Sequence, residues 1–207
     1  MSNQAISVPF DPKELLTRYD PRDSLSSYYS ILKTENQKVN LVSRETINSG
    51  LEILAADSLL PLELIERKPF ASYLDIGSGG GFPAFPIILT GQAKTATLIE
   101  RTSKKTLALE RIARGLNLAD ETIHIHKASF EEHNYTVKFD LVTLRLVALT
   151  QRILRKVESV LSDNGYFVYY SNPPEELSTP GWRLVTYCYQ VDNPTRQKQF
   201  TIFQKNK

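Results

Sequence analysis

The chain has 207 residues, of which 41% are hydrophobic and 23% are charged, so it can bury the core of one globular domain with a modest extension. Its formal net charge of +2 gives no strong basic field, its single cysteine, Cys188, excludes an internal disulfide framework, and no Cys/His cluster has the spacing of metal ligands. It begins without a secretion signal, and no apolar run reaches the roughly 18 residues of a membrane span, so we expect a cytoplasmic protein with one core.

The first third of the chain is predicted to be helical. Four apolar residues follow the i, i+3, i+4, i+7 spacing of an amphipathic helix: Leu25, Tyr28, Tyr29 and Leu32. Asp23 or Ser24 is the expected N-cap of this helix. A second helical stretch covers residues 49–65, and Pro61 should kink it or end it near Leu60. Residues 1–70 therefore form the expected N-terminal helical extension.

From residue 71 the pattern changes to short apolar runs that alternate with possible helices. The runs lie at 72–76, 95–99, 122–126, 139–144 and 165–170, the last of them after an expected turn at 162–165. Strands separated by helices imply a parallel sheet with helices on both faces, because parallel strands need a crossover connection.

The end of the chain carries two further runs, 181–191 and 198–205, with no helix between them. We expect them to close the sheet as an antiparallel pair. The second run is basic and alternates apolar with polar residues, so it is predicted to be an edge strand with a solvated tail.

The first run of the parallel sheet ends in a glycine-rich turn, "LDIGSGGGFP", at residues 74–83. In an open parallel sheet, ligands bind beyond the carboxyl ends of the strands, where the strand order reverses. Four glycines allow positive φ and let a ligand approach the backbone: Gly77, Gly79, Gly80 and Gly81. The glycines alone fit a turn without a ligand almost equally well.

Two acidic residues sharpen this interpretation. Asp75 lies near the end of the first run, and Glu100 ends the second, where an acid can accept hydrogen bonds from both hydroxyls of a ribose. A nucleoside-containing cofactor is therefore expected, either a dinucleotide or S-adenosylmethionine. Phe82 occupies the third glycine position of the dinucleotide fingerprint, and a negative Asp75 would repel a pyrophosphate but attract a sulfonium. The pattern favours S-adenosylmethionine.

At this point the chain resembles the bacterial 16S ribosomal RNA guanine-N7 methyltransferase family (RsmG, also called glucose-inhibited division protein B). The likeness covers most of residues 25–170 and rests on "NQKVNLVS", "DSL", "LDIGSGGGFP", "LIERTSKK", "LNL" and "FDLVTLR", in the family's order. The resemblance implies a class I S-adenosylmethionine-dependent methyltransferase domain over 71–207, with a Rossmann-like doubly wound sheet and a closing antiparallel hairpin.

The turn and the resemblance together give the expected site. The expected cofactor-binding residues are Asp75, Gly77, Gly79, Gly81, Phe82, Glu100, Ser129 and Phe130. Arg145 matches an arginine of the family's active site, although it could also be a surface arginine after a buried strand. Lys104 and Lys105, with Arg145, are the expected RNA contacts, although the two lysines and other helical cations such as Arg111 could simply form solvated helix faces.

The chain also departs from the family pattern. Leu54 stands where members usually have a histidine before "DSL", residues 128–130 are "ASF" in place of Arg-Ala-Glu, Leu146 replaces alanine after Arg145, and 169–174 lack the common Lys-Gly. The missing charges are ones that could contact RNA.

Three functions therefore stay open. The first is methylation of ribosomal RNA or the small ribosomal subunit, at guanine N7, by a monomer; N7 loses no proton, so this reaction needs positioning more than a general base. The second is a cofactor-binding protein that has lost catalysis. The third is a methyltransferase for a small molecule or a protein.

Overall fold

The computed structural model describes residues 5–66, 68–191 and 196–206. Its elements in chain order are β1 (Ile6–Ser7), α1 (Pro12–Tyr19), α2 (Ser24–Asn36), the π-helical turn η1 (Thr46–Gly50), α3 (Leu51–Leu59), the 3-10 turn η2 (Leu60–Leu64), β2 (Phe70–Ile76), α4 (Ala84–Leu89), β3 (Ala93–Glu100), α5 (Ser103–Gly115), β4 (Ile123–Lys127), β5 (Phe139–Leu144), α6 (Gln151–Val160), β6 (Leu161–Tyr169), β7 (Trp182–Val191) and β8 (Arg196–Lys205). Among these described helices, none is long and apolar enough to cross a membrane.

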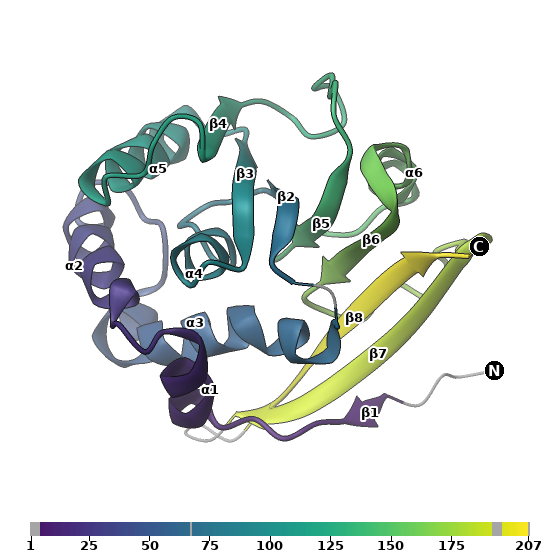
Figure 1. Ribbon diagram of the computed structural model, residues 1–207, viewed down its shortest axis with the longest axis horizontal. Helices are drawn as coiled ribbons and strands as arrows, with labels where there is room; N and C mark the ends of the chain where they lie inside the picture. Colours follow the sequence, from purple (N-terminus) through teal and green to yellow (C-terminus); the bar gives the residue numbers. More distant parts are fainter. Residues whose placement is uncertain (1–4, 67, 192–195, 207) are drawn as a thin grey trace.

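All the described strands join one sheet in the order β1-β7-β8-β6-β5-β2-β3-β4 (Figure 1). Strands β2 to β6 pair in parallel, which confirms the predicted parallel sheet; helices separate the strands as predicted, except that residues 128–138 between β4 and β5 contain no helix. The chain moves outward from β2 to β3 and β4, then crosses back to β5 on the other side of β2. The strand order therefore reverses next to β2, and in open parallel sheets ligands bind at the carboxyl ends of the strands beside such a reversal.

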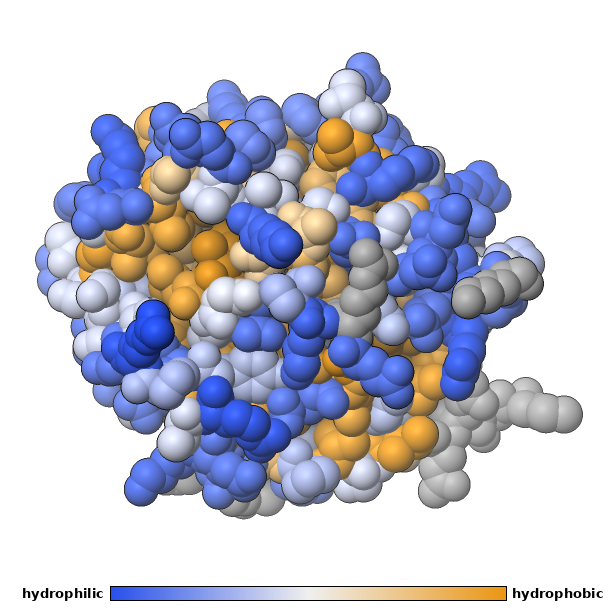
Figure 2. Space-filling view, viewed as in Figure 1, coloured by the Kyte–Doolittle hydropathy of each residue, from blue (hydrophilic) through white to orange (hydrophobic). Residues whose placement is uncertain are grey.

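The closing antiparallel pair is also confirmed, but the predicted edge position of its second strand is wrong. β8 lies between β6 and β7 and is antiparallel to both. Phe200 and Phe203 are at most 1% exposed, because β8 is covered on both faces of the sheet. The edge on this side of the sheet is formed instead by β1, where Ile6 is 51% exposed. Figure 2 shows hydrophobic surface in the region of β1 and β7.

The two faces of the sheet carry separate hydrophobic clusters. Neighbouring residues of a strand point to opposite faces, so Tyr73 belongs to one cluster and Leu74 to the other. The cluster around Tyr73 includes helices α1 to α5, and the cluster around Leu74 includes α6. Leu25, Tyr28 and Leu32 of α2 are at most 2% exposed, so the N-terminal helices share a core with the sheet.

Three local predictions need correction. Asp23 is the N-cap residue of α2, as predicted, but its side chain makes no capping hydrogen bond; instead the carboxylate of Asp20 accepts the N–H groups of Ser24 at 2.7 Å and Leu25 at 2.9 Å. The first third is not wholly helical, since it contains the strand β1. This strand was not predicted because its two residues are too few to show a periodicity. The expected turn at 162–165 lies inside β6, at the irregular pairing between Phe139 and Leu141 of β5. Pro61 does end α3, two residues earlier at Leu59.

Candidate functional site

A cavity of about 550 Å³ lies at the carboxyl ends of β2, β3 and β5. Its wall includes Gly77, Gly79 and Phe82 of the glycine turn, Glu100 at the end of β3, and Arg145 after β5. The sequence places these residues at the ends of three different strands, and the parallel sheet brings the ends together.

The backbone of the glycine turn has the predicted conformation at three positions. Gly77, Gly79 and Gly81 have φ values of 73°, 53° and 91°. A Cβ at Gly77 would lie 2.7 Å from a methyl group of Val147, so the missing side chain lets the loop after β5 pack against the turn. A Cβ at Gly81 would lie 2.2 Å from the ring of Phe85. Gly81 therefore packs toward α4 and does not line the cavity, unlike the other predicted glycines of the site.

Tyr28 of α2 supports the outer side of this turn. Its buried hydroxyl donates a hydrogen bond of 2.7 Å to the carbonyl oxygen of Gly80, and its ring packs on Phe82 and Phe85 with centroids 5.2 Å and 5.0 Å away. The helical periodicity predicted only that Tyr28 is buried. Its contact with a turn about fifty residues later is set by how α2 packs on the sheet.

Glu100 is held inside the cavity by two backbone N–H groups. One carboxylate oxygen accepts the N–H of Gly79 at 3.0 Å, and the other accepts that of Thr102 at 2.7 Å. Each carboxylate oxygen can accept a further hydrogen bond. The carboxylate is thus fixed in orientation and retains acceptor capacity for a ligand, as the predicted ribose contact requires.

Asp75 lies beneath the turn, behind the wall of the cavity. The hydroxyl of Thr143 donates to its Oδ1 at 2.5 Å, and its Oδ2 has no hydrogen-bond partner among the described residues. The side chain is 1% exposed, and this burial raises its pKa from 3.8 to about 6. Asp75 can act on a ligand through its charge, not through direct contact in this conformation.

The loop after β4 forms the far wall of the cavity with Ser129 and the buried Phe130. The Ser129 hydroxyl donates to Glu131 at 3.1 Å, which orders the loop. The two predicted lysines differ in position. Lys105, in the first turn of α5, lines the cavity, whereas Lys104 is exposed and does not line it.

Arg145 is not a surface arginine, since its side chain is only 10% exposed. Its Nη2 donates to the carboxylate of Asp57 at 2.5 Å, and its guanidinium lies over the ring of Tyr170, 5.3 Å from the centroid. Its Nη1 is buried and has no partner among the described residues. Arg145 therefore belongs to the cavity wall and carries a buried donor without a partner among the described residues, which favours the interpretation of Arg145 as a site residue.

Asp57, the carboxylate that holds Arg145, was not among the residues that the sequence predicted for the site. It is 2% exposed on α3 and also accepts Lys198 of β8 at 2.9 Å and the hydroxyl of Tyr189 of β7. A charged residue in the middle of the apolar stretch 49–65 was the available signal, because buried charges in proteins are normally paired. The partners themselves could not be read from the sequence.

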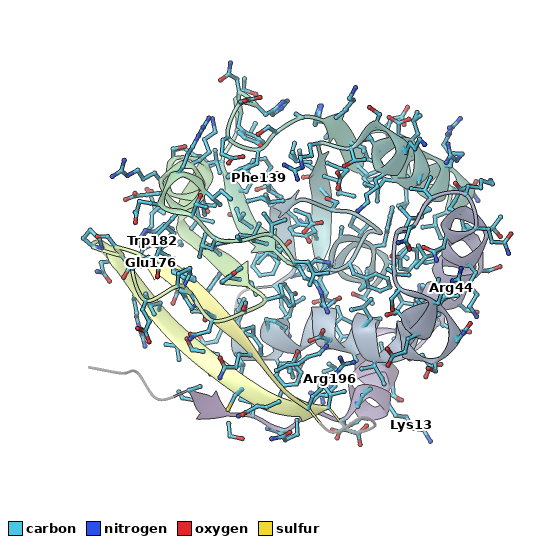
Figure 3. All side chains as sticks on the ribbon, turned by 180° about the vertical axis from the view of Figure 1, so that it is seen from behind. Lys13, Arg44, Phe139, Glu176, Trp182 and Arg196 are labelled. Carbon is cyan, nitrogen blue, oxygen red and sulfur yellow. The ribbon has the colours of Figure 1, made fainter. Side chains whose placement is uncertain are left out.

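The C-terminal hairpin brings its cations to α3. Arg196 and Lys198 share a smaller cavity of about 160 Å³ with Leu54 of α3, and Figure 3 shows Arg196 beside that helix.

Arg111, expected on a solvated face, is instead bonded to the buried carboxylate of Glu35 at 2.7 Å, and this hydrogen bond lowers the pKa of Glu35. The packing of α2 against α5 places Arg111 beside Glu35, while the Arg111 side chain remains 36% exposed.

Comparisons with known proteins agree with this geometry. The model of the family GidB, described as rRNA small subunit methyltransferase G, matches residues 22–180. Proteins named ribosomal RNA small subunit methyltransferase G are similar to the chain: one from Helicobacter acinonychis is 38% identical over 146 residues, which is 70% of this chain and 79% of that protein, and one from Helicobacter pylori is 34% identical over 165 residues, or 80% and 89%.

Among solved structures, the N-methyltransferase NodS from Bradyrhizobium japonicum in complex with S-adenosyl-L-homocysteine superposes with a TM-score of 0.60 at 16% identity, covering 87% of this chain and 100% of that one. At this identity the likeness establishes the fold, which is that of class I S-adenosylmethionine-dependent methyltransferases.

Proposed function

Because the chain belongs to the GidB family, the rRNA small subunit methyltransferase G proteins, we propose that it transfers a methyl group from S-adenosylmethionine to 16S ribosomal RNA. We further propose guanine N7 as the acceptor atom. The observation that carries the proposal is the carboxylate of Glu100, fixed inside the cavity by the glycine turn with acceptor capacity to spare.

The residues present fit this cofactor. A cavity of about 550 Å³ is within the usual range for small-molecule sites. Glu100 would accept the ribose hydroxyls, and Ser129 and Phe130 would lie along the adenine. Gly77 and Gly79 would let the cofactor approach the backbone, and the negative charge of Asp75 beneath them would attract the sulfonium and ammonium groups.

Methylation at guanine N7 requires little proton transfer by the protein. When bound, the cofactor would supply an electrophilic methyl group, whose transfer to N7 would leave S-adenosylhomocysteine as the second product. N7 carries no proton to remove, and the described residues that line the cavity include no histidine. The protein's part is then to hold the acceptor base with Arg145 and to exclude water with apolar side chains such as Leu54 and Phe82.

We propose a monomer that acts in the cytoplasm. In this view residues 71–207 are the methyltransferase domain, and residues 1–70 are an extension that braces the glycine turn through Tyr28. Lys105, at the rim of the cavity, would contact an RNA phosphate.

The test is transfer of labelled methyl from S-adenosylmethionine to small ribosomal subunits and to their naked RNA, followed by nucleoside mass spectrometry. We expect 7-methylguanosine in one of the two substrates. Cofactor binding is measured separately by calorimetry. Binding without 7-methylguanosine would favour one of the alternatives, a protein without catalysis or an enzyme for another substrate, and no binding would reject all methyltransferase functions.

A further inference from the structure

The buried cluster around Asp57 joins three segments that are far apart in the sequence. Its carboxylate on α3 accepts donors from Arg145 after β5, Tyr189 on β7 and Lys198 on β8. One negative charge therefore faces two cations. Of the two cations, only Arg145 lines the large cavity; Lys198 lines the smaller one.

This cluster fixes the guanidinium of Arg145 in one orientation. Nη2 is engaged by Asp57, and the plane of the group lies over the ring of Tyr170. The hydroxyl of Tyr170 donates to the carbonyl oxygen of Ser58 at 2.5 Å, so the ring is itself held to α3. Nη1 is left without a partner among the described residues.

A buried N–H of a charged group without a partner is costly, and such costs are concentrated at functional sites. Since Arg145 forms part of the cavity wall, a ligand that enters the cavity can supply the acceptor. Asp57 already engages Nη2, so Nη1 is the buried nitrogen of Arg145 that still lacks an acceptor among the described residues, and an acceptor atom on the ligand would satisfy it.

An arginine usually binds guanine with two donors, one to O6 and one to N7. Two donors would be harmful here, because a hydrogen bond at N7 would occupy the lone pair that attacks the methyl group. A single donor to O6 leaves N7 free. It also excludes adenine, which carries an amino donor in place of O6.

We propose that Asp57 holds Arg145 so that Nη1 alone donates to the O6 carbonyl oxygen of the acceptor guanine. Arg145 then contacts the substrate and Asp57 is a positioning residue. This inference rests on the proposed function, guanine N7 methylation, and adds to it the side chains that select the base.

The experiment uses 16S RNA transcribed with a mixture of guanosine and 6-thioguanosine, in which sulfur, a weaker acceptor, replaces O6. Limited methylation is followed by digestion and nucleoside mass spectrometry, which gives the ratio of 7-methylguanosine to 7-methyl-6-thioguanosine. Because the two nucleosides compete within one reaction, this ratio does not depend on the fraction of enzyme that is folded.

The wild-type protein should prefer guanosine by about tenfold, the effect of weakening one hydrogen bond to a charged group. Asp57→Asn should reduce the preference to about threefold or less, because the guanidinium loses its anchor and can turn. Tyr170→Leu, which removes the ring beneath the guanidinium, should reduce it in the same way and serves if Asp57→Asn does not fold. Lys198→Met removes the other cation from the same carboxylate and should keep the wild-type preference.

Each result decides the proposal. A wild-type preference near one overturns the contact to O6, and an unchanged preference in Asp57→Asn or Tyr170→Leu overturns the positioning role. Equal losses in Lys198→Met and Asp57→Asn would also overturn it, since the effect would then belong to the whole cluster. If the wild-type protein forms no 7-methylguanosine on this RNA or on small subunits assembled from it, the proposed function itself fails.

Discussion

The two sides of the cavity are built in different ways. The proposed cofactor side comprises Gly77, Gly79, Glu100, Ser129 and Phe130, which lie at or just after the ends of the consecutive strands β2, β3 and β4. The proposed acceptor side comprises Asp57, Arg145 and Tyr170, which come from α3 and from the ends of β5 and β6.

The cofactor side relies on backbone conformation and on hydrogen bonds to main-chain N–H groups, which short sequence motifs encode. The acceptor side relies on buried charges that meet only after folding. Changes on the first side should therefore act on cofactor affinity, and changes on the second on the choice of acceptor. The two sides meet where Val147, two residues after Arg145, packs against Gly77.

The largest effect is expected where the two sides meet. In Gly77→Ala the new Cβ would lie 2.7 Å from Val147, at a φ of 73°, so strain and overpacking together should cost about 4 kcal/mol. Calorimetry should show at least a hundredfold weaker binding of S-adenosylmethionine. Gly91→Ala is the matched control, since Gly91 has a φ of 72° and nothing within 4 Å of its Cβ position. Equal losses of cofactor affinity in the two variants would contradict the role of the contact.

The second effect concerns the charge beneath the turn. Burial raises the pKa of Asp75 to about 6, so between about pH 4 and 6 the folded protein binds more protons than the unfolded chain. Its contribution to the unfolding free energy therefore falls as the pH rises through this range, by about 3 kcal/mol in total. Asp75→Asn should remove this loss and be more stable than the wild type at pH 7, as urea unfolding at pH 4.5 and 7 will show.

The same variant should bind S-adenosylmethionine more weakly, because the cationic ligand prefers the ionised carboxylate. Glu35 supplies a control of opposite sign: Arg111 lowers its pKa, so Glu35→Gln should lose more stability at pH 7 than at pH 4. Unchanged cofactor affinity in Asp75→Asn would show that the carboxylate serves only the fold.

A somewhat smaller effect is expected from Glu100→Gln. The amide group would place a donor against the N–H of Gly79 or of Thr102 and would offer one acceptor fewer to a ribose. Loss of one hydrogen bond to a charged group corresponds to about 2 kcal/mol, or roughly thirtyfold in affinity. Glu131→Gln changes another carboxylate of the cavity wall and should alter cofactor binding by less than about threefold. If both variants lose affinity alike, the ribose contact is misassigned.

The smallest effect separates the two lysines of α5. Lys105 lines the cavity and Lys104 does not, so Lys105→Ala should raise the KM for RNA about fivefold and lower the slope of log affinity against log salt concentration by about 1. Lys104→Ala should change both quantities less. Methyl-transfer rates measured over a series of salt concentrations give the answer, and equal effects of the two substitutions would assign the RNA contact to the helix face as a whole.

Much of the fold could be predicted from short patterns. The apolar runs located β2 to β6, and the lack of a helix between the last two runs indicated the antiparallel hairpin. The edge position of β8 was wrong, because strand alternation does not report which strands lie on either side. The hydrogen bonds from Asp20 to the start of α2 were missed, because Asp20 lies four residues before the helix and the helical periodicity describes only residues within it.

The sequence by itself determined the glycine turn, its positive φ angles and the acid at the end of the next strand, since these depend on residues at fixed spacing along adjacent strands. Only the tertiary structure decided that Gly81 packs inward, that Lys105 and not Lys104 reaches the cavity, and that Asp57 meets Arg145. A charge is buried only where a partner compensates for its lost hydration, and that partner can stand anywhere in the chain. The pairing of buried charges is therefore a property of the folded chain and not of any single stretch of sequence.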